Sequence, residues 1–267
     1  MPVTRSFSAA FAIMLVALFA QPALAQRMFD EDGEQDQRNV AGVFDYYALV
    51  MGWSPTYCSE RESGGYEPQC DRNDGRRYSF VLHGLWPQHE RGFPGNCRTR
   101  RKPFVPQGVI DNMLDIMPSP SLIIHEYRKH GTCSGLDPAS YYDLARKLFK
   151  SIKLPQRYAN PMENQFSEVA DIERDFLEVN PELRPDMFAV VCGGAGNRLK
   201  ELRICMSKDG KPRACGANED QRRLCSSQRK ILLPPVRSSK IGPDTAEDRE
   251  KMKVSPANRP RVIESLR

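Results

Sequence analysis

The chain has 267 residues, of which 40% are hydrophobic and 27% charged, and its formal net charge is +5. A charge this modest is common for a solvated surface, so it permits a polyanionic partner without indicating one. No second long apolar stretch follows the one at the N-terminus, so we expect a soluble mature protein.

The N-terminus has the pattern of an export signal. Arg5 supplies the positive charge, residues 9–20 form an apolar run of 12 residues, and Ala23 and Ala25 make a small-residue cleavage site. A membrane anchor is the alternative, but the run is shorter than the ~20 residues that span a bilayer. We therefore expect residues 1–25 to be a cleaved signal peptide and the mature protein to be periplasmic or secreted.

The cysteines predict disulfide bonds rather than a metal site. In an exported chain an even number of cysteines is typical of a disulfide framework. None of them are spaced as Cys-x-x-Cys, so we do not expect structural zinc. Spacing alone does not choose among the possible pairings of the eight cysteines, which are Cys58, Cys70, Cys97, Cys133, Cys192, Cys205, Cys215 and Cys225.

Between the ends of the chain, residues 40–233 contain enough aromatic and aliphatic side chains for one domain. The acidic stretch before it, residues 26–39, is typical of a flexible leader. After it, residues 234–267 carry prolines, serines and mixed charges but no aromatic residue. We expect this tail to be disordered.

In chain order, the first predicted elements are strands at residues 44–53 and 78–83, and Gly84 permits a turn directly after the second strand. Helical spacing and then two more apolar runs follow. They predict helices at residues 111–117, 122–130, 139–152 and 168–179, and strands at 187–192 and 201–206. Because no regular βαβ repeat is present, we expect an α+β fold with helices around a central antiparallel sheet.

Three of the four histidines lie in two short blocks, one containing His83 and the other His125 and His130. Histidine suits proton transfer in both directions because its unperturbed pKa is roughly 6.5. The second block also contains Glu126 and Lys129. Two imidazoles, a carboxyl group and an ammonium group are the groups needed to cleave a phosphodiester beside a ribose hydroxyl.

Helical geometry places the polar groups of the second block on one side. With Glu126 at 0° on a helix that advances about 100° per residue, Lys129 lies at roughly −60°, His130 at roughly +40° and His125 at roughly −100°. Arg128 points to the opposite side. A solvated charged face is the ordinary explanation of such a run. The first block, with His83 at a sheet edge beside Trp86, favours a catalytic site instead.

These two blocks carry a resemblance to a known family. The chain resembles the ribonuclease T2 family of exported, metal-independent endoribonucleases over most of residues 44–225. The segment HGLWP, which starts at His83, is similar to that family's first active-site segment. The segment HEYRKHGTC, which starts at His125, is similar to the second. Tyr127 stands where the family commonly has tryptophan, and Gln88 follows the first segment where residues vary, so the preferred base stays open.

The resemblance implies a role for each residue and a general mechanism. His130 would take the proton of the ribose 2′-hydroxyl, and His83 would give one to the departing 5′-oxygen. Glu126 and Lys129 would stabilise the transition state, and His125 would help to hold the phosphate. Cleavage of single-stranded RNA would pass through a 2′,3′-cyclic phosphate to 3′-phosphate ends, which makes the enzyme formally a lyase.

The resemblance also implies RNA as the partner, a monomer, and no metal or other cofactor. Trp86 could stack a base or only pack in the core. Arg98, Arg100, Arg101 and Lys102 could follow the RNA backbone or form a solvated loop. The implied disulfides are Cys58–Cys70, Cys97–Cys133, Cys192–Cys225 and Cys205–Cys215.

Two other functions compete with this hypothesis. A non-catalytic exported RNA-binding relative is one, but a binding module does not need an acid–base pair of histidines. A metal-dependent phosphoesterase is the other, but the histidine blocks have no neighbouring cluster of aspartate and histidine ligands.

Overall fold

The computed structural model describes residues 39–61, 66–71, 77–194, 196–226 and 228–236. The predicted signal peptide, almost all of the predicted leader and the tail beyond Val236 lie outside these residues. Val236 is buried, and its amide donates to the carbonyl of Pro161. The packed domain therefore continues beyond residue 233, where the composition of the sequence placed its end.

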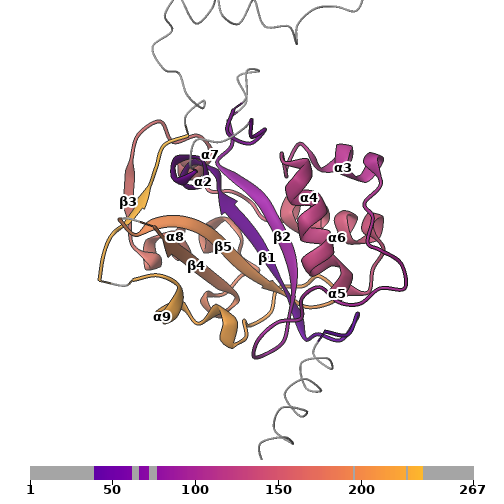
Figure 1. The fold of residues 1–267 in the computed structure, drawn as a ribbon. Coiled ribbons are helices and arrows are strands. Elements are labelled where there is room, and N and C mark those ends of the chain that lie inside the picture. Colours follow the sequence, from indigo (N-terminus) through magenta and orange to yellow (C-terminus); the bar gives the residue numbers. More distant parts are fainter. Residues whose placement is uncertain (1–38, 62–65, 72–76, 195, 227, 237–267) are drawn as a thin grey trace, which may run out of the picture.

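A six-stranded sheet forms the centre of the domain (Figure 1). Strand β1 (Tyr46–Trp53) lies between β2 (Phe80–Gln88) and β5 (Arg198–Met206) and is antiparallel to both. The antiparallel core that the sequence predicts is confirmed, and a single pair between β5 and β6 is parallel. The remaining strands are β4 (Phe188–Gly193), antiparallel to β5, and β3 (Gln165–Ser167), antiparallel to β6 (Ile231–Leu233).

Alternation along the strands gives the sheet two different faces. Leu49 and Met51 of β1 and Leu202 of β5 belong to the hydrophobic core. Because successive side chains of a strand point to opposite faces, Glu201 and Arg203 of β5 lie on the other face. The apolar face stabilises the domain, and the polar face is left for chemistry.

The helices pack around the sheet (Figure 1). They are α2 (Ser54–Glu60), α3 (Gln107–Met113), α4 (Pro120–Glu126), α5 (Thr132–Ser134), α6 (Pro138–Ser151), α7 (Gln156–Ala159), α8 (Val169–Val179) and α9 (Gln221–Leu224). α6 contacts β1 and β2, where the Tyr141 hydroxyl donates to the Leu85 carbonyl at 2.8 Å. This bond fastens the helical layer to the strand that carries the first histidine block.

Helix α3 begins and ends earlier than the predicted residues 111–117. Pro106 directly precedes its first turn, where the missing N–H of a proline costs nothing. After the helix, the amides of Ile116 and Met117 still bond to the Met113 carbonyl. The apolar spacing runs through this turn, so the sequence pattern placed the helix too late.

Strand β2 does not end at His83, and the turn predicted at Gly84 is wrong. The strand continues to Gln88, but its register with β1 shifts between Val50 and Met51. Leu82 pairs with Met51 and Gly84 pairs with Val50, which leaves His83 as one extra residue. This is a β-bulge, a feature that re-aims a side chain without ending the strand.

Four disulfides join the cysteines in the pairs that the family resemblance implies: Cys58–Cys70, Cys97–Cys133, Cys192–Cys225 and Cys205–Cys215. No cysteine is free in the described part of the chain. In that same part, no helix combines the length and the apolar character needed to cross a membrane.

Candidate active site

The two histidine blocks meet where α4 ends beside the edge strand β2. Glu126 is the last residue of α4 and is only 3% exposed. A Cβ atom added at Gly84 would lie 2.3 Å from a carboxylate oxygen of Glu126 and 2.4 Å from the indole nitrogen of Trp86. The glycine is therefore needed for the close approach of helix and strand, not for a turn.

The helix predicted over residues 122–130 changes form inside the site. α4 is followed by a π-helical turn, Tyr127–Gly131, in which the Thr132 amide bonds to the carbonyl of Tyr127 five residues back. Such turns are rare and occur frequently at functional sites. The wider turn carries His130 into the protein, where it is 3% exposed, while His125 on α4 stays exposed.

His83 is held between two carboxyl groups. Its Nδ1 atom lies 3.1 Å from Glu201, and its Nε2 atom lies 3.8 Å from Glu126. Burial by itself lowers the pKa of His83, but the hydrogen bond to Glu201 and the charges of Glu126 and Glu201 outweigh burial and raise it. This environment favours the protonated imidazole.

The environment of His130 has the opposite effect. Burial, together with the positive charges of Lys129 and other neighbours, lowers the pKa of His130 to about 3. Its Nδ1 atom is buried and has no hydrogen-bond partner among the described residues. The neutral imidazole is therefore the stable form, and its Nε2 atom is the nitrogen available for a ligand proton.

Glu126 lies between the two histidines and has a shifted pKa of its own. Burial raises the pKa of this carboxyl group, although His83, the Trp86 hydrogen bond, His125 and Lys129 act in the other direction. The indole N–H of Trp86 donates to one oxygen at 2.6 Å. The other oxygen faces His83 and is free to carry a proton.

Trp86 is enclosed by its neighbours on the polar face of the sheet. Its ring stacks on His130, meets His83 edge-on and lies under the guanidinium of Arg203, 5.1 Å from the ring centroid. Its half-buried indole thus contacts both histidines and donates to Glu126. Of the two roles left open for Trp86, packing is the one this arrangement favours.

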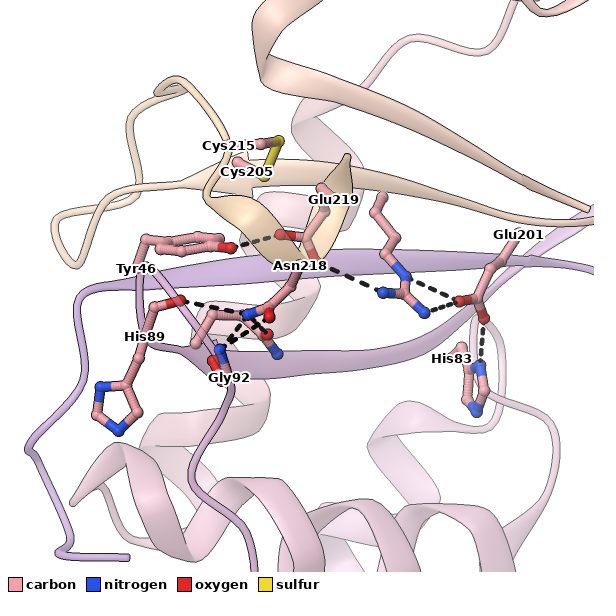
Figure 2. Close-up of polar contacts among 11 residues, drawn as sticks. Tyr46, His83, His89, Gly92, Glu201, Cys205, Cys215, Asn218 and Glu219 are labelled. Carbon is pink, nitrogen blue, oxygen red and sulfur yellow. Dashed lines mark hydrogen bonds and ion pairs between the residues drawn. A yellow bond between two sulfur atoms is a disulfide. The ribbon is translucent and has the colours of Figure 1, made fainter. Parts of the chain in front are cut away.

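Glu201 and Arg203 belong to the site although the sequence did not single them out. The Arg203 guanidinium donates to Glu201 through two nitrogens, at 2.9 and 2.8 Å, and lies 3.5 Å from Glu219. Figure 2 shows this series of polar contacts, which runs from His83 through Glu201 to the buried pair of Glu219 and Tyr46. The one signal available was a Glu-x-Arg pair directly before the apolar end of the strand, and the contact with His83 depends on tertiary structure.

Two cavities flank the histidines. The first, of about 630 Å³, contains His83 and His125. It is also lined by residues of β1, α2, α4 and β5 and of the segment after α2, among them Gly52, Tyr57, Glu60, Gln69, Ser121, Lys200 and Glu201. The second, of about 460 Å³, is lined by Trp86, Gln88, Phe93, Lys129, His130, Arg203, Ala217, Asn218, Arg223 and Leu224. A molecule bound across both would place its middle at Glu126.

Phe93 is an exposed aromatic side chain that the sequence analysis missed. It is 56% exposed, and its ring centroid lies 6.5 Å from that of His130. Asn218 accepts from the amide of Gly92 and donates to the carbonyl of the same residue, which holds the loop beside the second cavity (Figure 2). The only signal in the sequence was an aromatic residue between glycine and proline.

The other predicted residues lie around this centre. Lys129 is half-buried at the second cavity, and Arg128 is exposed away from both cavities. The run of Arg98, Arg100, Arg101 and Lys102 is exposed in a loop and lines neither of the two cavities.

Metal-ligand geometry occurs once among the described residues, at Cys205, Cys215 and Glu219. The two cysteines form a disulfide, whose sulfurs are not thiolate ligands, and Glu219 accepts a hydrogen bond from the Tyr46 hydroxyl. This cluster is a structural contact and not a metal site.

Comparison with known proteins shows that this chain is similar to ribonucleases. The model of the Ribonuclease T2 family matches residues 44–215. A ribonuclease of Aeromonas hydrophila is 34% identical over 203 residues, which cover 74% of this chain and 88% of that protein. Among solved structures, RNase NT in complex with 5′-AMP has a TM-score of 0.55 at 23% identity, over 72% of this chain and 98% of that one. Trichomaglin, an S-like ribonuclease, has a TM-score of 0.57 at 21% identity, over 73% and 99%.

Proposed function

Because the chain belongs to the ribonuclease T2 family, we propose that it is an exported endoribonuclease that cleaves single-stranded RNA through a 2′,3′-cyclic phosphate. The observation that carries the mechanism is the contrast between the environments of its two histidines, His83 and His130. The pKa of His130 is lowered to about 3 and that of His83 is raised. A general base must start neutral and a general acid must start protonated, so one environment suits each role.

In the first step, the Nε2 atom of His130 accepts the proton of the ribose 2′-hydroxyl. The 2′-oxygen attacks the phosphorus, and the bond from phosphorus to the 5′-oxygen of the next nucleotide breaks. The Nε2 atom of His83 gives its proton to that leaving oxygen. The products are a 2′,3′-cyclic phosphate and a 5′-hydroxyl, and hydrolysis of the cyclic phosphate with the histidine roles reversed gives a 3′-phosphate.

Glu126 and Lys129 stabilise the charge that develops on the phosphate oxygens. Phosphate oxygens accept hydrogen bonds, so a carboxyl group stabilises them directly only in its protonated form. Burial raises the pKa of Glu126 and favours that form. Lys129 supplies a positive charge from the second cavity, and exposed His125 helps to hold the phosphate from the first.

The proposed direction of proton transfer determines which of the two nucleotides lies in which cavity. The ribose that loses its 2′-proton must lie beside His130, so its base enters the second cavity, where Phe93 offers an exposed face for stacking. The leaving nucleotide must lie beside His83 and enters the first cavity. We assign Trp86 to the positioning of His130 and Glu126, because its ring already contacts both histidines and Arg203.

Export is supported by two features of the chain. The first is the signal pattern in residues 1–25. The second is the set of four disulfides, which form and persist in oxidising compartments. We propose a periplasmic or secreted monomer that uses no metal or other cofactor.

The decisive experiment identifies the product ends. Purified mature protein is incubated in excess chelator with RNA, with the same sequence as DNA, and with RNA methylated at the 2′-oxygen of the cut nucleotide. We expect only the unmodified RNA to be cut, with cyclic or 3′-phosphate ends and 5′-hydroxyls by mass spectrometry. His83→Ala and His130→Ala should each lower the rate by about 10²–10⁴-fold. Products with 5′-phosphate ends, or comparable cutting of DNA, would show that water attacks the phosphorus.

A further inference from the structure

His83 and Glu201 form a hydrogen bond although a strand lies between them. His83 belongs to β2 and Glu201 to β5, and β1 separates these two strands. Neighbouring strands are about 4.8 Å apart, so β2 and β5 are about 9–10 Å apart. The two side chains therefore reach toward each other over β1 to bring Nδ1 and Oε2 within 3.1 Å (Figure 2).

The residue of β1 at the crossing point is Gly52. It pairs with Glu201 on one side and with Val81 on the other, so its missing side chain belongs to the same face as Glu201. A Cβ atom added there would lie 3.8 Å from the Cβ of His83, an ordinary contact. A longer side chain would stand between His83 and Glu201, so the glycine leaves the gap that their hydrogen bond occupies.

Glu201 is itself held from the other side. Its second oxygen accepts from both Nε and a terminal nitrogen of Arg203, and the residue is only 8% exposed. A third contact of this guanidinium reaches Glu219, which is fixed by the Tyr46 hydroxyl. Fork-like pairing of this kind fixes geometry as well as charge, so the carboxylate presents its remaining oxygen to His83.

We propose that Glu201 is a positioning residue that orients His83 across the gap left by Gly52, with its Nδ1–H toward β5 and its Nε2 toward the scissile phosphate. The proposal rests on the proposed function for the role of Nε2 as proton donor. A carboxylate that accepts the second N–H of an imidazole fixes its tautomer and orientation and stabilises the imidazolium. Glu201 touches neither the reacting atoms nor the leaving group and acts through His83.

Other charges also face His83, and they define what Glu201 adds. They come from α4, the π-turn, β5, α2 and the segment after α2: Glu126, His125, His130, Arg203, Lys200, Glu60 and Glu67. Glu126 is the other carboxyl group within salt-bridge distance of the ring, at 3.8 Å from Nε2. Among the described residues, Glu201 alone is hydrogen-bonded to Nδ1, so we expect its removal to affect the orientation of the ring as well as the charge beside it.

Four variants separate the charge of Glu201, its contact with His83, the mere addition of a Cβ atom at residue 52, and general effects. Glu201→Gln keeps a hydrogen-bond acceptor for Nδ1 but removes the charge. Gly52→Val leaves Glu201 and Arg203 unchanged and places a side chain in the gap, whereas Gly52→Ala adds only the tolerated Cβ. Asp115→Asn is the matched control, because it removes an exposed carboxylate that pairs with Arg146 and lines neither cavity.

The first readout is an NMR titration of the His83 ring in isotope-labelled protein, with His83→Ala used for assignment. Loss of an adjacent opposite charge should lower the pKa of His83 by about 1–3 pH units in Glu201→Gln. Gly52→Val should change it in the same direction, while Gly52→Ala and Asp115→Asn should not change it. The second readout is the pH profile of kcat/KM on a dinucleoside phosphate. In Glu201→Gln, the decline at high pH that is due to His83 should move to lower pH by the same amount. The loss of activity should therefore shrink as the pH is lowered.

An unchanged His83 titration in folded Glu201→Gln and in Gly52→Val would overturn the positioning role, whatever the activity. A loss of activity that is equal at every pH would overturn it too, because a merely structural defect behaves that way. If the wild-type protein does not cut RNA, the proposed function fails, and the titration still decides whether Glu201 positions His83.

Discussion

The ring planes of Trp86 and His130 lie within 20° of each other, and their centroids are 4.9 Å apart. This stacking covers one side of the imidazole with an apolar surface and excludes water from it. It also explains why His130 is buried so close to a cavity. We therefore expect Trp86 to position His130 and the exposed Phe93 to bind the base.

Phe93 and Trp86 should therefore respond differently to substitution. Phe93→Ala removes the exposed stacking surface, which is worth about 1–3 kcal/mol per base, so KM for RNA should rise roughly tenfold or more with little change in kcat. Trp86→Ala should instead lower kcat, because His130 and Glu126 lose their support. Steady-state kinetics on a dinucleoside phosphate separates the two effects. A rise in KM alone for Trp86→Ala would return the base-stacking role to that residue.

The pH dependence of kcat/KM should reflect the three shifted groups. His130 is the base and works when neutral, so activity should fall only as the pH drops toward its pKa of about 3. Glu126 donates when protonated, and its pKa is raised above 4.5, so activity should decline as the pH rises through that value. His83 works when protonated, and its pKa is raised above 6.5, so the last decline lies at still higher pH.

The variant Glu126→Gln tests this order. An amide donates a hydrogen bond at every pH, so the first alkaline decline should disappear and the decline due to His83 should remain. Initial rates across the pH range, with folding checked by circular dichroism, measure this. An unchanged alkaline profile in Glu126→Gln would mean that the carboxyl group does not act as a donor.

The neighbouring cations Arg128 and Lys129 should have unequal effects. Lys129 lines the second cavity, whereas Arg128 is exposed and lines neither cavity. Lys129→Ala should lower kcat/KM by about 10²-fold or more, in the range seen when one transition-state contact is removed. Arg128→Ala should stay close to wild type. Equal losses in the two variants would indicate that general attraction of RNA, and not a specific contact, is responsible.

The bond Cys97–Cys133 should matter for activity beyond its effect on stability. It joins the loop that carries Phe93 to α5, which directly follows the π-turn, and nearby the Asn96 amide donates to the Lys129 carbonyl at 2.8 Å. Replacing both cysteines by serine should cost about 2–4 kcal/mol of unfolding free energy. It should also raise KM at temperatures where the variant is folded. The pair Cys58–Cys70 serves as the comparison, because it fastens α2 beside the first cavity and not the loop that carries Phe93. The same KM from both double variants would argue against a local effect.

The sequence was sufficient for the family, the α+β fold and the residues at the centre of the site, because these depend on short contiguous segments. It was insufficient wherever two distant segments determine the result. The bulge at His83 depends on the register with β1, and the role of Gly84 depends on the approach of Glu126. The sequence did not predict the π-turn, because an α-helical period of 3.6 residues fits the same segment nearly as well.

Glu201 shows the same limit more clearly. A glutamate in a strand two residues before an arginine is ordinarily a surface ion pair. Its contact with His83 depends on the order of strands in the sheet and on Gly52 in β1, the strand between them. Neither the strand order nor the position of Gly52 opposite Glu201 can be read from a local sequence pattern. Sequence analysis therefore misses Glu201.

The bulge has a consequence for how this enzyme can lose its activity. On one side of His83, the pairs Leu82 with Met51 and Val81 with Gly52 follow one register, and on the other side Gly84 with Val50 continues it after a skip of one residue. Deleting the codon for His83 would therefore join the two registers into one uninterrupted ladder, with every remaining side chain of β2 on its present face. Most single-codon deletions within a paired strand reverse the two faces of the strand, but this one would not. One genetic step would thus remove the proposed proton donor and leave the pairing of β1 and β2 in register.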